Sequence, residues 1–165
     1  MLVIGNGESR KNIDIDSINK PKIGCNAAYR DLNIDYLVCV DQKTLKEAIN
    51  NHKKIYTRNE WYKRYKSYSN VFTVPDLPYK ETQRWDNPWH WGSGPYAVLL
   101  GATFEYDTIM MIGFDLYPSN KKINNIYKNT NNYAKKDANP VDPSYWIYQI
   151  SKVFQYYENK EFVIW

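Results

Sequence analysis

The chain is poor in the residues that most often mark a catalytic or metal site. It contains only two histidines and two cysteines in 165 residues, and the cysteines are too far apart for a CxxC pair. The sequence therefore gives no indication of a zinc or thiol–disulfide centre. Cys25 and Cys39 each lie in a short apolar run, which predicts two buried free thiols in a reducing compartment.

Long apolar runs and blocks of one charge are also missing. No stretch approaches the ~18 apolar residues that a membrane helix needs, and no basic-then-apolar leader opens the chain. The net charge is +4, with lysines scattered along the chain instead of forming a stripe. We therefore expect a cytoplasmic protein with no membrane span and no nucleic-acid partner. The composition leaves a homo-oligomer open.

Aromatic residues, by contrast, are plentiful, with sixteen tyrosines and six tryptophans. Such side chains combine a large contact area with a polar group, which suits a binding pocket. An AT-rich coding sequence would produce the same excess of tyrosine, together with Asn, Lys and Ile. Composition alone does not choose between these explanations.

Short β-favouring runs alternate with helical stretches along the chain. The predicted strands cover residues 1–5, 22–26, 35–41, 53–57, 69–75, 107–115 and 161–165, and the predicted helices 44–52, 93–104 and 143–159. This order predicts a single α/β domain over residues 1–165, with a Rossmann-like, doubly wound and mostly parallel sheet. A polar, Asn-rich stretch at about 118–143 predicts a mobile loop.

Small polar residues follow four of the predicted strands. Asn6, Asn26, Asp41 and Asp115 hold these positions. Ligands of doubly wound sheets bind beyond the carboxyl ends of the strands, which is where these side chains would gather. Any strand has to end in something polar, so each residue alone says little, but the four together favour a binding edge.

Two glycine-containing segments are candidates for anion binding. The first, GNGES at residues 5–9, gives a ligand close access to the backbone but matches neither the GxGxxG fingerprint nor a Walker loop. The second consists of Gly92, Ser93 and Gly94, which lead directly into a predicted helix. Their N–H groups and the positive end of the helix dipole would face an anion. A simple helix cap by Ser93 is the alternative.

His90 and three tyrosines are candidate catalytic or phosphate-binding groups. His90 lies between two tryptophans and is either an acid/base or phosphate donor, or a packed structural histidine. Tyr117, Tyr127 and Tyr133 lie in or beside the Asn-rich loop, together with several lysines. Phenol and ammonium donors on a movable segment suit a departing phosphate. Incidental tyrosines in a solvated insertion are the alternative.

Taken in order, these motifs resemble the small bacterial lipooligosaccharide sialyltransferases of glycosyltransferase family 42, and the related 6-hydroxymethylpterin pyrophosphokinase-like proteins. The matching segments are IGNGES, GCNAAY and SGPYAVLLGATFEYDTIMMIGFDLY, followed by the later tyrosines, and they span about residues 2–133. The resemblance implies a Rossmann-like domain that binds a cytidine-type nucleotide sugar and requires no metal or other cofactor. A small phage-encoded member of this group would fit the compact, AT-rich chain.

The resemblance also implies roles for individual residues. The donor-binding residues would be Asn6, Gly7, Ser9, Asn26, Asp41, Ser93, Gly94 and Tyr133. Tyr117 and Tyr127 match the two tyrosines that stabilise the leaving phosphate, and His90 or Asp115 would serve as base. Asp41 stands about where the family has an asparagine.

Departures from the family pattern leave other functions open. Glu8 replaces a proline, His90 replaces an arginine, and residues 142–149 lack the histidine that serves the family as base. The sequence favours a glycosyltransferase-like protein that transfers or hydrolyses the sugar of a nucleotide-activated donor, with a CMP-sugar preferred. The alternatives are a non-catalytic nucleotide-binding or sequestering module, and a Mg²⁺-dependent diphosphokinase-type enzyme with Asp41 and Asp115 as ligands.

Overall fold

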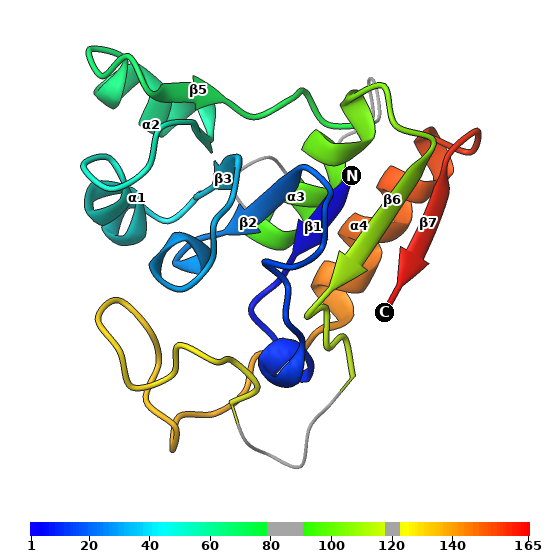
Figure 1. The fold of residues 1–165 in the computed structure, drawn as a ribbon. Coiled ribbons are helices and arrows are strands. Elements are labelled where there is room, and N and C mark those ends of the chain that lie inside the picture. The colour runs from blue at the N-terminus through cyan, green and yellow to red at the C-terminus, as the bar shows by residue number, and fades with distance from the viewer. Residues whose placement is uncertain (79–90, 118–122) are drawn as a thin grey trace.

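A single sheet of seven parallel strands forms the centre of the molecule, in the order β5-β4-β3-β2-β1-β6-β7 (Figure 1). The computed structural model describes residues 1–78, 91–117 and 123–165. The expected Rossmann-like, single-domain α/β fold is confirmed, and every strand pair in the described chain is parallel. The strands are Leu2–Ile4 (β1), Lys22–Cys25 (β2), Tyr36–Val38 (β3), Ile55–Thr57 (β4), Val71–Thr73 (β5), Thr108–Ile112 (β6) and Glu161–Ile164 (β7).

Helices cover both faces of the sheet. The helices α3 (Ser93–Thr103) and α4 (Ser144–Tyr156) pack on one face. The other face carries α1 (Gln42–Ala48), α2 (Asn59–Tyr65) and the short 3₁₀ helix η2 (Ala28–Arg30). A second 3₁₀ helix, η1 (Glu8–Asn12), follows β1. The sequence analysis missed α2, a short helix whose core-facing residues Trp61, Tyr62 and Tyr65 are only partly buried.

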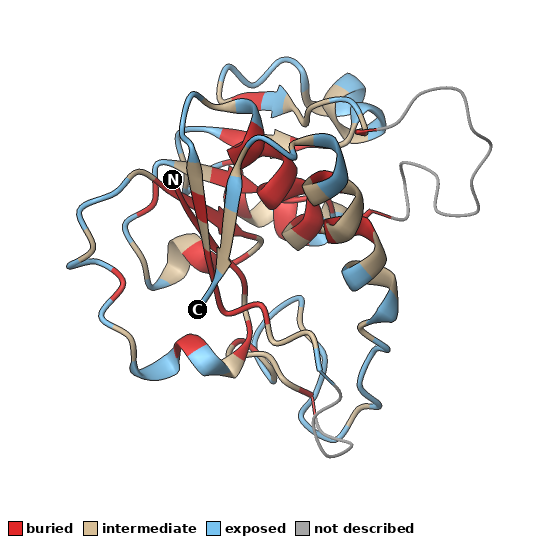
Figure 2. Ribbon diagram, turned by 90° about the vertical axis from the view of Figure 1, so that its right-hand side faces the viewer, coloured by how far each residue is buried: buried red, intermediate tan, exposed pale blue. Residues whose placement is uncertain are grey.

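The helix α3 lies between the sheet and α4, which explains why its sequence is apolar on all sides. Most of its residues are buried, and Figure 2 shows such residues gathered in the central strands and the helices against them. Gly101 allows the close approach to β1, since a Cβ there would lie 3.0 Å from Val3 Cγ2. This packing fixes the amino end of α3 at the carboxyl edge of the sheet. None of the helices in the described ranges has the length and apolar content of a membrane span.

The strand order reverses between β1 and β6, and the backbones that leave these two strands stay in contact. The Gly5 N–H donates to the Ile112 carbonyl at 2.8 Å, and the Gly7 N–H donates to the Gly113 carbonyl at 2.9 Å. A Cβ on Gly5 would lie 2.3 Å from the Gly113 oxygen, and Gly113 itself has a φ of +73°. Both positions therefore require glycine.

We expect Gly5→Ala to lower the free energy of unfolding by at least about 2 kcal/mol, because its methyl group would overlap backbone atoms that have no room to move. The control is Gly94→Ala, whose Cβ would lie 3.3 Å from a ring carbon of Phe114, a side chain that can shift. Its cost should stay below about 1 kcal/mol in the same urea titration. Equal costs for the two variants would contradict a rigid contact between β1 and β6.

Candidate functional site

A cavity of about 360 Å³ opens at the carboxyl edge of the sheet. Its walls come from the ends of β1, β2, β3, β4 and β6, the amino end of α3, part of α4 and the loop residues 124–125. Its volume lies within the range of small-molecule binding sites. Residues predicted from the sequence that line it are Asn6, Gly7, Asn26, Asp41, Ser93, Gly94 and Asp115.

Ser93 ties the start of α3 to the ends of β2 and β3. Its hydroxyl donates to Asn26 Oδ1 at 2.7 Å and accepts the Val40 N–H at 3.1 Å. Asn26 adopts a left-handed conformation with a φ of 50°, which asparagine tolerates better than most residues. The alternative that Ser93 caps its own helix is wrong, because α3 has Gly92 at its N-cap and no side-chain cap bond.

The first turn of α3 presents backbone donors to the cavity. The first hydrogen bond of the helix runs from the Tyr96 N–H to the Gly92 carbonyl at 3.2 Å. The N–H groups of Ser93 and Gly94 have no acceptor among the described residues, and Pro95 has no N–H to satisfy. Gly92 to Pro95 all line the cavity. Two free donors and the positive end of the helix dipole are therefore available to an anion.

The loop after β1 differs from this arrangement, because its backbone N–H groups at residues 7–9 already donate hydrogen bonds to other protein groups. The N–H groups of Gly7, Glu8 and Ser9 donate to Gly113 O, Asn124 Oδ1 and Asp115 Oδ2 at 2.9, 2.7 and 2.9 Å. The Ser9 hydroxyl donates to the other oxygen of Asp115, and Ser9 does not line the cavity. A protein carboxylate thus occupies the place where the sequence predicted a phosphate.

Among the described residues, three charged side chains line the cavity. Asp115 follows β6 and packs against Gly7, where a Cβ would lie 2.4 Å from its Cγ. Asp41 follows β3 and is exposed. Arg58 follows β4, and its guanidinium binds Glu60 at 2.9 Å. Sequence reasoning missed Arg58, although it directly follows a predicted strand, because only small polar residues were considered at strand ends.

Tyr133 lies behind the cavity wall and orients Asn6. Asn6 Nδ2 donates to the Tyr133 hydroxyl and to the Cys25 carbonyl, both at 3.2 Å. The same hydroxyl accepts the Ala27 N–H at 3.2 Å, and burial raises the pKa of Tyr133. Tyr133 does not line the cavity. It therefore contacts Asn6 and the backbone, and it does not bind a sugar donor directly as the sequence predicted.

The structure does not place the expected leaving-phosphate pair at the cavity. Tyr127 is buried, and its hydroxyl donates to Asp31 Oδ1 while it accepts Arg10 Nη2 at 2.6 Å. Burial, followed by the bond to Asp31, raises the pKa of Tyr127. Tyr117 is 60% exposed, and neither tyrosine lines the cavity. His90 lies outside the described residues.

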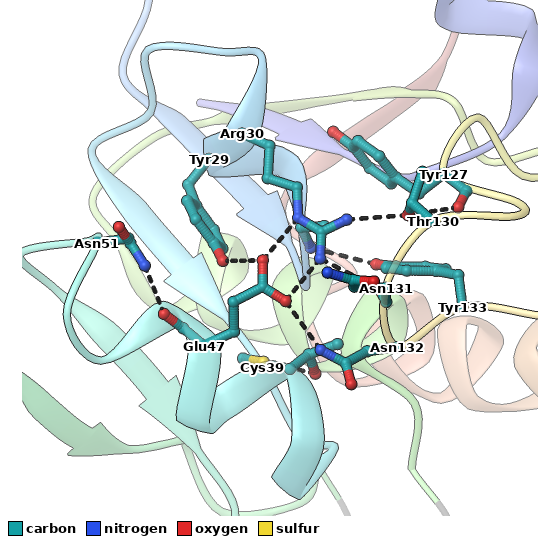
Figure 3. Close-up of polar contacts among 12 residues, drawn as sticks. Tyr29, Arg30, Cys39, Glu47, Asn51, Tyr127, Thr130, Asn131, Asn132 and Tyr133 are labelled. Carbon is teal, nitrogen blue, oxygen red and sulfur yellow. Dashed lines mark hydrogen bonds and ion pairs between the residues drawn. The ribbon is translucent and has the colours of Figure 1, made fainter.

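Contacts to η2 and α1 hold the described part of the Asn-rich loop (Figure 3). Arg30 makes a two-bond ion pair with Glu47, at 2.7 and 2.6 Å, and Tyr29 donates to the same carboxylate at 2.7 Å. From the loop, Thr130 accepts Arg30 Nη1 at 2.9 Å and Asn132 donates to Glu47 at 2.8 Å. The mobility predicted for residues 118–143 stays a prediction, but these contacts dock residues 130–132.

The cavity wall also includes a thiol. Cys25 and Cys39 are buried and free, as the sequence predicted. Burial raises the pKa of Cys25 to about 12, so the thiol is protonated at neutral pH and is a poor nucleophile. Within the described residues, no three His, Cys, Asp or Glu side chains group as metal ligands would.

Comparison with protein-family models, with curated proteins and with solved structures finds no match for this chain. The functional argument therefore depends on the residues of the cavity. Asn124, Asn125 and Trp146 also line it, and no sequence pattern had singled them out. They reach the cavity through the docking of the loop and of α4, which are long-range contacts.

The pH dependence of loop docking should follow Glu47. Its bonds to Arg30 lower its pKa from 4.5 to about 2. The folded pKa is depressed, so the stabilisation is complete above about pH 4.5 and is lost as the pH falls towards 2. We expect the difference in free energy of unfolding between the wild type and Glu47→Gln to shrink over this interval.

The measurement is urea unfolding at several pH values, with Glu158→Gln as control. Glu158 is an exposed glutamate that pairs with no described residue. Its variant should differ from the wild type by a small amount that does not change with pH. A pH-independent difference for Glu47→Gln would contradict the ion pair as the source of loop docking.

Proposed function

We propose that this domain binds a nucleotide-activated sugar in the cavity and transfers or hydrolyses the sugar, as a glycosyltransferase-like enzyme. The observation that carries the proposal is that one cavity is lined both by free backbone N–H donors and by amide and carboxylate side chains. The amino end of α3 provides free donors for a phosphate. The ends of β1, β2, β3 and β6 provide amide and carboxylate groups for hydroxyls and base edges.

The anion half of the ligand belongs at α3. There the cavity combines two backbone N–H groups that have no acceptor among the described residues, those of Ser93 and Gly94, with the dipole of an eleven-residue helix. Donors fixed before the reaction stabilise charge that develops on a leaving phosphate, and they need not reorganise. This role falls to the α3 backbone in place of Tyr127, whose hydroxyl is occupied by Asp31 and Arg10.

The polar, uncharged half of the ligand belongs towards β1 and β6. Asn6, Asn124 and Asn125 line this part. The Trp146 ring of α4 lies at the other end, beside Gly92, where a Cβ would be 2.9 Å from its indole nitrogen. Amides both donate and accept, so they suit the hydroxyls of a sugar or the edge of a base. The preference for a cytidine monophosphate donor comes from the family resemblance.

Asp115 is the proposed general base. It lines the cavity, and its two bonds from Ser9 fix the carboxylate in one orientation. A fixed carboxylate beside a bound donor can take the proton of an acceptor hydroxyl or of water. This assignment does not depend on the histidine that the family pattern would supply.

A second candidate is binding without turnover. It is favoured by one observation, the engagement of the Tyr127 hydroxyl away from the cavity. A domain of this kind would bind nucleotides tightly and leave activated sugars intact.

Donor binding is tested with Asn26→Asp. Asp keeps an oxygen for the Ser93 hydroxyl and tolerates the left-handed backbone, but places a negative charge beside the α3 donors. We expect at least about a tenfold loss of CMP affinity by calorimetry. Asn129→Asp is the matched control, because Asn129 also has a positive φ of 66° and accepts the Lys136 N–H, but does not line the cavity. Its affinity should equal that of the wild type.

Turnover is tested with Asp115→Asn. Asn keeps one acceptor for the Ser9 N–H, and its NH2 group can donate to the Ser9 hydroxyl. It cannot take a proton, so transfer or hydrolysis of a CMP-sugar should fall about 10²-fold or more while donor affinity changes little. The control is Asp41→Asn, which alters the other carboxylate among the described lining residues and should lower turnover only a few-fold. No turnover by the wild type with any activated sugar, combined with tight nucleotide binding, would support the binding module instead.

A further inference from the structure

Asn6 and Asn26 follow the adjacent parallel strands β1 and β2, and both side chains line the cavity. An asparagine amide has one acceptor atom, Oδ1, and one donor group, Nδ2, which carries two N–H bonds. The protein partners of each amide therefore decide which group it has left for a ligand. These two amides are held in opposite senses.

Asn6 is held by its donor group. Its Nδ2 donates to the Cys25 carbonyl and to the Tyr133 hydroxyl, both at 3.2 Å. A carbonyl oxygen only accepts hydrogen bonds, so this contact fixes which end of the amide faces Cys25. Both N–H bonds of Nδ2 are then engaged, whereas Oδ1 is buried and has no hydrogen-bond partner among the described residues. A buried acceptor without a partner is costly, so this atom favours a ligand that brings a donor.

Asn26 has the opposite arrangement. Its Oδ1 accepts the Ser93 hydroxyl at 2.7 Å, and its Nδ2 donates to no described residue. Together with the backbone N–H groups of Ser93 and Gly94, this Nδ2 makes the α3 end of the cavity a group of donors. The oxygens of an ionised phosphate only accept hydrogen bonds, so the phosphate belongs beside Asn26 and finds no donor at Asn6.

The strand order places Asn6 between this phosphate position and the proposed base. β1 lies between β2, which Asn26 follows, and β6, which Asp115 follows. In the proposed reaction, the transferred sugar likewise lies between the leaving phosphate and the base. Adjacent strands are about 4.8 Å apart, a spacing that matches a phosphate and a hydroxyl of the sugar attached to it. The edge of a nucleotide base lies on the far side of the ribose and is more distant.

We propose that Asn6 Oδ1 accepts a hydrogen bond from a hydroxyl of the transferred sugar, on the carbon next to the one that carries the phosphate, and that Tyr133 is the positioning residue of Asn6. The inference rests on the proposed function, because it names the class of sugar for the same cavity. That class is an aldose with a hydroxyl at carbon 2. Asn6 thus contacts the sugar and leaves the phosphate to Asn26 and α3.

The test measures the binding of three sugar phosphates by calorimetry. The α anomers of glucose 1-phosphate and mannose 1-phosphate differ only in the configuration of the hydroxyl at carbon 2, and 2-deoxyglucose 1-phosphate lacks this hydroxyl. The 2-deoxy compound should bind at least about tenfold more weakly than the better of the other two, because it leaves Asn6 Oδ1 without a donor. A smaller difference, or no measurable binding of any of the three, overturns the proposal.

Tyr133→Phe tests the positioning role. It keeps the ring but removes the hydroxyl that accepts Asn6 Nδ2, so the preference over the 2-deoxy compound should fall to within about threefold. A purely structural role would weaken all three sugar phosphates alike and leave their ratio unchanged. Tyr29→Phe is the matched control, because the Tyr29 hydroxyl donates to Glu47 and has no bond to Asn6. Its ratio should equal that of the wild type.

Asn6→Leu removes the acceptor itself and keeps a side chain of similar size. This variant should bind the 2-deoxy compound as well as it binds the better of the two hydroxylated sugars. If Asn6→Leu does not fold, the comparison of Tyr133→Phe with Tyr29→Phe still decides.

The inference and the proposed function fail separately. A wild type that binds CMP-sugars but does not discriminate among the three sugar phosphates contradicts the inference alone. Discrimination that depends on Asn6, in a protein that binds no nucleotide, contradicts the proposed function alone. A loss of affinity for 3′-deoxy-CMP relative to CMP that depends on Asn6 would place the ribose at this atom and overturn the inference.

Discussion

The close contact between the chains leaving β1 and β6 is the constraint on which the site depends. Two glycines allow these backbones to stay hydrogen-bonded beyond the ends of their strands, at the point where the strand order reverses. In most doubly wound sheets the chains diverge here and open a crevice. In this protein they stay in contact, with Asp115 over Gly7, and the cavity is lined by the ends of β1, β2, β3, β4 and β6.

The contact between β1 and β6 explains why two similar-looking glycine segments behave differently. Both place N–H groups at the carboxyl edge of the sheet. The loop after β1 lies against β6, whose Asp115 satisfies Ser9, and so its positive potential is neutralised within the protein. At the start of α3, the Ser93 side chain contacts the neutral groups of Asn26 and Val40, and no described residue accepts from the N–H groups of Ser93 and Gly94. Its backbone donors therefore remain available to a ligand. The electrostatic potential at each glycine segment thus depends on whether the neighbouring strand end supplies a carboxylate, as β6 does, or neutral groups, as β2 and β3 do for Ser93.

The sequence predicted the parts of the fold that depend on local patterns. Apolar runs ending in small polar residues placed the strands and brought Asn6, Asn26, Asp41 and Asp115 to one edge, because parallel strands present their carboxyl ends together. It could not predict that Asp115 would bond Ser9, more than a hundred residues earlier. Contacts between side chains so far apart in the chain leave no periodic signal. The tyrosines of the loop were misjudged for a related reason, since their partners belong to other segments of the chain.

Two of those tyrosines and Arg10 form a hydrogen-bonded network behind the cavity wall. Arg10 is almost completely buried and binds both Tyr127 and Asp31, so removing any one member would leave a buried polar group without its partner. Tyr133 continues this network to Asn6 at the cavity wall. Because Asn6 Nδ2 and Arg10 Nη2 both bond to tyrosines of the loop, loosening the loop would also release the orientation of Asn6. The network that looked like catalytic machinery in the sequence thus acts one layer behind the site, where it holds the wall in the shape that the ligand meets.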